Sequence, residues 1–250
     1  MDGDNKLRID HLIHDLKGPL AVVEAGVTGL LGRRASYGPL TEKQEKVLRR
    51  IFRNVRITQQ LVVDALELGR CGEGVFHPSR FALSEWLQAV LVEIFDLFDA
   101  EESERIRACD RLEDFQSALD DQGVTLTIDE ANWERRVTLD RQKLTQILRN
   151  LLMNALKYRK RRVSLEVAHR DDFLVLGVWD DGRGIPPDLH ERIFECYFQA
   201  SPEGPQVDRG HGLGLAAALV LTEAMGGGLT LKSEEGAGAR FEVAIPLKPR

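Results

Sequence analysis

Residues 140–158 read DRQKLTQILRNLLMNALKY, and the spacing of their apolar positions predicts one long helix. Asn150, Asn154 and Lys157 recur at helical spacing and share one face, while the apolar residues between them should pack inward. A solvated face would account for any one of these polar residues taken alone. Polar side chains on a core helix also suit a ligand site, so the rest of the chain has to decide between the two interpretations.

A first glycine motif follows a predicted strand. Residues 178–186 read VWDDGRGIP, a strand that ends on Asp180 and is followed by Gly182 and Gly184. Glycines at this spacing suit a backbone bent closely round a ligand. Taken singly, the pattern is equally typical of an acidic turn.

A second glycine motif opens an apolar helix. Residues 210–227 read GHGLGLAAALVLTEAMGG, with Gly210, Gly212 and Gly214 at the start. The free N–H groups and the dipole of a helix N-terminus favour phosphate. Three polar or glycine-rich motifs in this order indicate a site for an anionic ligand.

The composition is that of a globular protein with one large or two modest domains: 250 residues, 43% hydrophobic and 30% charged. A net charge of −6 leaves no global basic field, so we expect no nucleic-acid partner. The N-terminus has no secretory signal pattern, and no apolar run approaches the ~18 residues of a membrane span. Cys71, Cys109 and Cys196 lack metal-ligand spacing, which predicts free thiols in a reduced, cytoplasmic setting.

Two helices are expected in the first part of the chain. A heptad seam marks the first helix, and a similar stripe marks the second, which begins after an N-cap at Thr41 and ends at about Leu68. The seam residues are Ile9, Ile13, Leu16, Leu20, Val23, Val27 and Leu30, and those of the second helix are Leu48, Ile51, Val55, Val62 and Ala65. A short connection makes the pair an antiparallel hairpin. Because one hairpin cannot bury both stripes well, we expect a homodimer whose hairpins form a four-helix bundle.

After Pro78 the pattern changes to mixed helices and strands, which predicts an α+β domain. The expected elements are a helix over 83–98, strands over 124–128, 163–170 and 173–180, and the helix over 140–158. The highly charged residues 99–123 are interpreted as a solvated helix or an insertion, with no function assigned. The expected domains are therefore a helical hairpin over 1–72 and a mixed domain over 73–250.

In their order along the chain, these motifs resemble those of the sensor histidine kinases of two-component signalling. The family's asparagine box is matched by QILRNLLMNALKY, its first glycine box by DDGRGIP, its phenylalanine box by IFECYFQ and its second glycine box by GHGLGLA. Its closing strand turn is similar to GAGARFEVAIP, and its phosphoacceptor box to HDLKGPL. The resemblance covers residues 5–247 and implies an α/β-sandwich ATP-binding domain of the histidine kinase, gyrase and chaperone type.

The resemblance implies a site for ATP, with an adenine end. Asp180 would accept a hydrogen bond from the adenine amino group, and Gly182 and Gly184 would shape that end of the pocket. Tyr158 would lie against the adenine ring.

By the same resemblance, the other end of the site holds Mg²⁺ and the phosphates. Asn154 would hold Mg²⁺ through its side-chain oxygen, with Asn150 as its partner near the phosphates and Lys157 facing them. The lid backbone would approach the triphosphate at Gly210, Gly212, Leu213 and Gly214. Phe194 and Phe198 would pack the lid, a role hard to separate from core packing, and His211 is interpreted as a tolerated lid side chain or a phosphate contact.

The phosphoacceptor box places His14 at the edge of the helical seam, where a neutral imidazole is a competent nucleophile. Pro19 should loosen the turn beside it by crowding the carbonyl of Asp15. By resemblance, Asp15 takes the ring proton as the other ring nitrogen attacks the γ-phosphate. Asp10 is a rival orienting group, and His11, which no acid follows, is interpreted as a surface histidine.

The sequence thus predicts a homodimeric histidine autokinase that passes the γ-phosphoryl group of ATP to His14 and then to an aspartate of a response regulator receiver domain. Gly18 stands where many family members carry threonine or asparagine, which leaves phosphatase activity in doubt. One alternative is a phosphotransfer or scaffold protein with a non-catalytic nucleotide pocket. Another is an ATP-driven clamp like the topoisomerase, chaperone and mismatch-repair ATPases. The basic run KYRKRR, residues 157–162, is interpreted beyond Lys157 as a solvated helix end.

Overall fold

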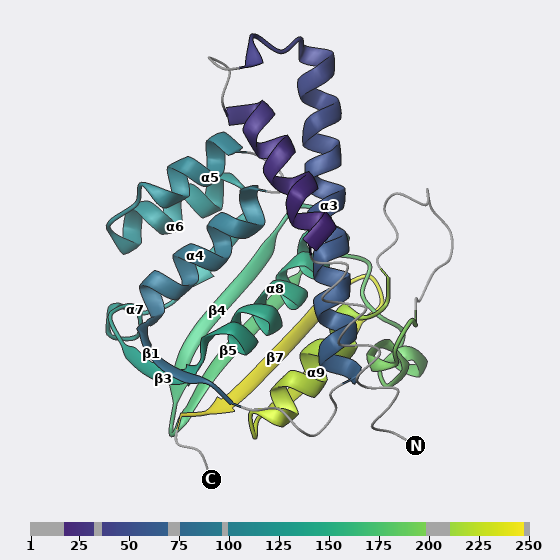
Figure 1. Ribbon diagram of the computed structural model, residues 1–250. Helices are drawn as coiled ribbons and strands as arrows, with labels where there is room; N and C mark the ends of the chain where they lie inside the picture. Colours follow the sequence, from purple (N-terminus) through teal and green to yellow (C-terminus); the bar gives the residue numbers. More distant parts are fainter. Residues whose placement is uncertain (1–17, 33–36, 70–75, 97–99, 199–210, 248–250) are drawn as a thin grey trace. The chain divides into compact units, whose positions relative to one another are not determined.

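The computed structural model describes residues 18–32, 37–69, 76–96, 100–198 and 211–247 (Figure 1). The chain divides into two compact units, Met1–Cys71 and Gly72–Arg250. The first is helical and the second combines helices with a sheet, so the predicted α+β class is confirmed.

The first unit is a helical hairpin. Residues 18–32 are helical, and the second helix, α3, runs over Glu42–Gly69. Thr41 caps α3 as predicted, because its hydroxyl accepts from the Gln44 N–H at 3.3 Å while the Gln44 side chain accepts from the Thr41 N–H at 2.9 Å. The predicted phosphoacceptor His14, its neighbour Asp15 and the first part of the seam lie outside the described residues.

Polar and apolar contacts join the two helices of the hairpin. The Glu24 carboxylate bonds to the Arg56 guanidinium and to the Gln59 amide, each at 2.8 Å. The buried apolar side chains are valines: Val27, Val55 and Val62. Several other predicted seam residues stay exposed or half-buried in the single chain, so the hairpin buries only part of its apolar surface.

The second unit contains a five-stranded sheet in the order β2-β4-β5-β7-β6. Its strands are β2 (Val124–Thr127), β4 (Val163–Arg170), β5 (Phe173–Asp180), β6 (Gly228–Glu234) and β7 (Gly238–Pro246). Only β2 and β4 pair in parallel. The register places Val163 opposite Asp180, so the start of β4 and the end of β5 lie at the same edge of the sheet.

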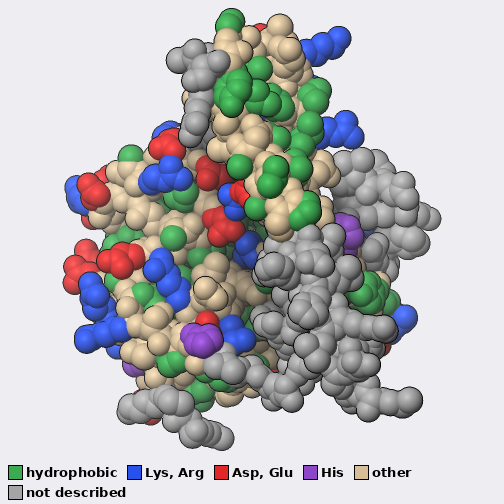
Figure 2. Space-filling model, in the orientation of Figure 1, with side chains coloured by type: hydrophobic (Ala, Val, Ile, Leu, Met, Phe, Trp, Pro, Cys, Tyr) green, Lys and Arg blue, Asp and Glu red, His purple; other side chains and the backbone are tan. Residues whose placement is uncertain are grey.

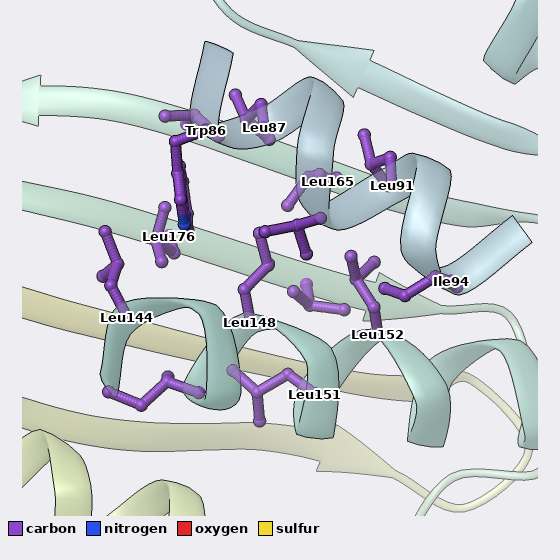
Figure 3. Close-up of a cluster of buried hydrophobic side chains, with 14 of the residues drawn as sticks. Trp86, Leu87, Leu91, Ile94, Leu144, Leu148, Leu151, Leu152, Leu165 and Leu176 are labelled. Atoms are coloured by element: carbon purple, nitrogen blue, oxygen red, sulfur yellow. The ribbon is translucent and has the colours of Figure 1, made fainter. Parts of the chain in front are cut away.

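Three helices cover one face of this sheet, which gives a two-layer sandwich (Figure 1). They are α4 (Leu83–Asp96), α8 (Arg141–Tyr158) and α9 (Gly214–Ala224). Figure 3 shows leucines of α4 and α8 pointing into one layer against Leu165 and Leu176 of the sheet. The core lies between these helices and the sheet, and α8 occupies its centre.

The start of α8 is fixed by a buried carboxylate. Asp140, 5% exposed, accepts hydrogen bonds from the N–H groups of Gln142 and Lys143 at 3.1 Å, as an N-cap does. The same side chain accepts from the His77 N–H at 3.1 Å. On the next turn the Trp86 ring N–H donates to the Thr145 hydroxyl at 2.9 Å, which ties α8 to α4.

The interpretation of residues 99–123 as a solvated helix is wrong. The segment forms two helices, α5 (Ala100–Arg107) and α6 (Leu112–Asp121), and Ile106, Phe115 and Leu119 are fully buried. From α4, the Gln88 amide donates to the carbonyls of Ile106, Arg107 and Cys109 at 3.0 to 3.1 Å. Among so many charged residues these few apolar positions form no clear pattern in the sequence, but they are enough to pack both helices against the core.

The remaining elements are short. A two-stranded sheet pairs β1 (Pro78–Ala82) with β3 (Arg136–Asp140), and one turn of helix, α7, spans Glu130–Trp133. Two 3-10 turns, η1 (Pro187–Leu189) and η2 (Arg192–Phe194), precede α9. Within the described ranges, no helix is both long and apolar enough to span a membrane.

The substitution Leu148→Ala should lower the free energy of unfolding by about 2–5 kcal/mol, because Leu148 is fully buried and its removal leaves a cavity between α8, α4 and the sheet. Urea unfolding followed by circular dichroism measures the change. The control is Gln142→Ala on the exposed surface of the same helix, with an expected change within about 0.5 kcal/mol. Equal effects of the two substitutions would contradict the placement of Leu148 in the core.

Candidate functional site

The second half of α8 carries the polar residues that the sequence singled out. Asn150 is 6% exposed, and Asn154, one turn further on, is half-buried. Lys157 and Tyr158 end the helix and are exposed. The two asparagines therefore lie on a protected flank of the helix, which is not the solvated face of the alternative interpretation.

Asp180, the last residue of β5, is a buried carboxylate. Its side chain is 5% exposed and accepts a hydrogen bond from the Gly182 N–H at 2.9 Å. Burial raises the pKa of Asp180 above its usual range, although the bond from Gly182 opposes the shift. A buried acceptor at a strand end is suited to a ligand that brings its own N–H donor.

The two glycines of the first motif approach the backbone of the protein itself. A Cβ on Gly182 would lie 2.4 Å from the carbonyl oxygen of Tyr158. A Cβ on Gly184, whose φ is +73°, would lie 1.9 Å from the carbonyl oxygen of Glu234. Glycine is required at both positions to pack this loop between α8 and β6, whatever ligand binds beside it.

Two cations lie near the Tyr158 ring. The Lys157 ammonium is 4.8 Å and the Arg183 guanidinium carbon 5.7 Å from the centre of the Tyr158 ring. Arg183, between the two glycines, received no role from the sequence. In the sequence Arg183 is only a cation inside a glycine motif, and this does not show that the Tyr158 ring lies beside it.

Asp181 is a second residue that received no role from the sequence. Its carboxylate accepts hydrogen bonds from the N–H groups of Lys160, Arg161 and Arg162, the loop that follows α8. These bonds hold the pKa of Asp181 below its usual range. The side chains of the basic run are exposed or half-buried, but they are not all simply solvated, because the Arg159 guanidinium donates to the Gln122 carbonyl at 3.0 Å and the Lys160 ammonium to the Gly236 carbonyl at 3.4 Å.

The second glycine motif meets α8 at Asn150. A Cβ on Gly214, the first residue of α9, would lie 3.6 Å from the Asn150 amide group. Gly212 accepts a hydrogen bond from the Tyr197 N–H at 2.8 Å, and Leu213 is buried. His211 is exposed, whereas Gly210 lies outside the described residues.

Phe194 and Phe198 pack against the core. The Phe194 ring meets the Phe241 ring edge-on at 6.4 Å, and the Arg192 guanidinium carbon lies 4.5 Å from the centre of the Phe198 ring. The structure thus brings both glycine motifs to α8, with Gly182 at the Tyr158 carbonyl and Gly214 at Asn150. Asp180 and its loop stand at one end of this flank and the start of α9 at the other.

Comparison with known proteins matches this region to one family. Residues 139–249 match the histidine kinase-, DNA gyrase B- and HSP90-like ATPases. Over 94% of its length the chain is 27% identical to the sensor histidine kinase RppB of Synechocystis sp., and over 95% it is 30% identical to the histidine protein kinase DivJ of Caulobacter vibrioides. The chain is thus similar to sensor histidine kinases over most of its length. Within the mixed unit, residues 139–249 match the ATPase domain of that type.

A solved structure shows a likeness over nearly the whole chain. The crystal structure of full-length ShkA in complex with AMPPNP aligns with 97% of the chain at a TM-score of 0.60 and 25% identity. The chain covers 46% of ShkA, 47% of RppB and 36% of DivJ. It therefore spans less than half the length of these relatives.

The substitution Asp180→Asn should stabilise the chain at neutral pH. A raised pKa means that ionising Asp180 costs more in the folded state than in the unfolded state, so this cost is absent below the ordinary pKa of about 3.9 and complete above the raised pKa. Asparagine avoids the cost and still accepts the Gly182 N–H. The gain in unfolding free energy should therefore shrink as the pH falls.

Urea unfolding of both proteins between about pH 4 and pH 8 measures this difference. The control for the loss of a carboxylate is Asp188→Asn on the exposed surface. A difference between Asp180→Asn and wild type that does not change with pH would contradict the stated cost of burying this charge.

Proposed function

We propose that this chain is an ATP-dependent histidine autokinase whose ATP site is the protected flank of α8. The observation that carries the proposal is the buried Asn150 face of α8, closed at one end by Gly182 on the Tyr158 carbonyl and at the other by Gly214 on the Asn150 amide. The family match over residues 139–249 and the AMPPNP complex of ShkA support a nucleotide as the ligand.

The adenine end of the site is Asp180 with its loop. The buried carboxylate, which already accepts from the Gly182 N–H, would also accept from the adenine amino group, a further donor that offsets the cost of burying the charge. Tyr158 would lie against the base, because its ring is exposed and its carbonyl lies beside Gly182. Because Gly182 and Gly184 have no side chains, their loop would leave room for the base at this end of the site.

The phosphate end of the site is the start of α9. This helix has 11 residues, and the N–H groups at its start, together with Gly212, Leu213 and Gly214, suit a triphosphate. Gly210 would join them, as the sequence motif predicts. Lys157 shares the face of Asn150 and Asn154 by helical spacing and would supply a positive charge to the phosphates.

Mg²⁺ fits the residues present. It prefers oxygen ligands and takes one or two from a protein, with waters and substrate phosphates filling the rest. The half-buried Asn154 amide offers such an oxygen one turn from Asn150. When bound there, Mg²⁺ would offset the negative charge of the phosphates.

The phosphoryl acceptor is proposed from the sequence. One imidazole nitrogen of His14 would form a bond to the γ-phosphorus as the bond to the bridging oxygen breaks and ADP leaves. Asp15 would take the proton from the other ring nitrogen. The group would then pass to an aspartate of a response regulator receiver domain, which regenerates His14.

Domain roles follow from the same proposal. Residues 1–72 would form the dimerisation and phosphoacceptor hairpin, and residues 73–250 the catalytic domain. Exposed apolar side chains on the hairpin support a homodimer, since Figure 2 shows hydrophobic side chains along it and Val22, Val23, Val47 and Ile51 are exposed. The cysteines support a cytoplasmic setting.

Incubation with γ-labelled ATP and Mg²⁺ tests the kinase. Wild type should take up label that survives base but not acid, as a phosphohistidine does. The variants His14→Gln and Asn154→Ala should take up none, because the first lacks the acceptor and the second the proposed metal ligand. The matched control His11→Gln should label like wild type.

The outcomes separate the candidate functions. Tight ATP binding with no label would favour the ATP-driven clamp, and no ATP binding would favour the phosphotransfer scaffold. Label that persists in His14→Gln would contradict the choice of acceptor.

Replacing Ile51 by Glu should shift the chain from dimer to monomer, because the substitution places a charge on the exposed apolar stripe of α3. Sedimentation velocity at a fixed protein concentration measures the change. The neighbouring exposed Lys46→Glu makes a larger change in charge away from the stripe and should leave the dimer intact. A wild type that sediments as a monomer would contradict the proposed bundle.

A further inference from the structure

The Asp181 carboxylate joins two walls of the proposed nucleotide site. It accepts from the Lys160 N–H at 2.8 Å, from the Arg161 N–H at 3.0 and 3.1 Å, and from the Arg162 N–H at 3.1 Å. In return, the Asp181 N–H donates to the Arg162 carbonyl at 3.3 Å. One side chain at the end of β5 thus satisfies three successive donors of the loop between α8 and β4.

The residues on either side of Asp181, at the end of β5 and just after it, have little conformational freedom. Before it, Asp180 is buried and paired with Val163 in the sheet. After it, Gly182 donates to Asp180 and lies so close to Tyr158 that a Cβ would fall 2.4 Å from the Tyr158 carbonyl oxygen. The bonds of Asp181 therefore set the distance between the end of α8 and the end of β5.

The contact depends on the shape of the loop and not on its positive charge. Asp181 accepts from main-chain N–H groups, while the Lys160, Arg161 and Arg162 side chains are exposed. A second carboxylate nearby allows a comparison. Glu235 is exposed and adjoins the loop at Gly184, where its Cα would lie 3.1 Å from an added Cβ.

We propose that Asp181 is a positioning residue for base recognition, which holds the Asp180 carboxylate at a fixed place relative to the Tyr158 ring. The inference rests on the proposed function, in which Asp180 accepts the adenine amino group. Asp181 itself does not touch the nucleotide. Its loss would let the two walls separate and would weaken the contact that distinguishes adenine from a base without the amino group.

The test compares the binding of ATP and inosine triphosphate, which lacks that amino group. Titration calorimetry on the full chain should show that wild type prefers ATP by about tenfold or more, the size expected for a hydrogen bond to a buried charge. The variant Asp181→Ala should bind ATP more weakly, with a ratio of the two affinities close to one. Asp181→Asn keeps an oxygen that can accept from the three N–H groups but loses the charge that strengthens these bonds, so it should give an intermediate ratio, and Glu235→Gln should match wild type.

The ratio separates positioning from a structural role. If Asp181→Ala weakens both nucleotides equally and keeps the wild-type ratio, the inference is overturned. If Asp181→Ala does not fold, Asp181→Asn decides by the same ratio, and an unchanged ratio overturns the inference. A wild type that binds ATP without preferring it would overturn the proposed adenine contact of Asp180 and, with it, the role given to Asp181.

Discussion

Helix α8 has to satisfy two opposed demands along a single length of chain. One face buries leucines against the sheet and α4, while the adjoining flank carries the buried Asn150 and the half-buried Asn154. The Asp140 cap and the Trp86–Thr145 bond fix where the helix begins and how it is rotated. Every motif of the site is then placed by its contact with this helix.

Much of the mixed unit could be predicted from the sequence because its elements carry strong periodic patterns. The strands β4 and β5 and the helix α8 lie where alternation and helical spacing placed them. β1 carries a weaker signal, since a five-residue strand with three exposed positions in a row hardly alternates. In α5 and α6 the buried residues are too few among the charges for composition to show that they dock.

The site residues could be predicted as types and motifs, but their contacts could not. Spacing put Asn150 and Asn154 on one flank, and the structure agrees. The glycines were expected to make room for a ligand, whereas Gly182 and Gly184 first make room for the carbonyls of Tyr158 and Glu234. Asp181 escaped notice because its partners are main-chain groups, which leave no trace in the sequence around it.

Because Asp181 holds the loop after α8 through main-chain groups, the backbone path of this loop does not depend on the side chains that it exposes. Since the carboxylate uses only N–H groups, the side chains at positions 160–162 can change in size and charge while the loop keeps its path. Proline alone, which has no N–H, is barred from these three positions. The patch beside the nucleotide site is therefore free to diverge between relatives, and with it whatever this surface meets, while the pocket behind it stays the same.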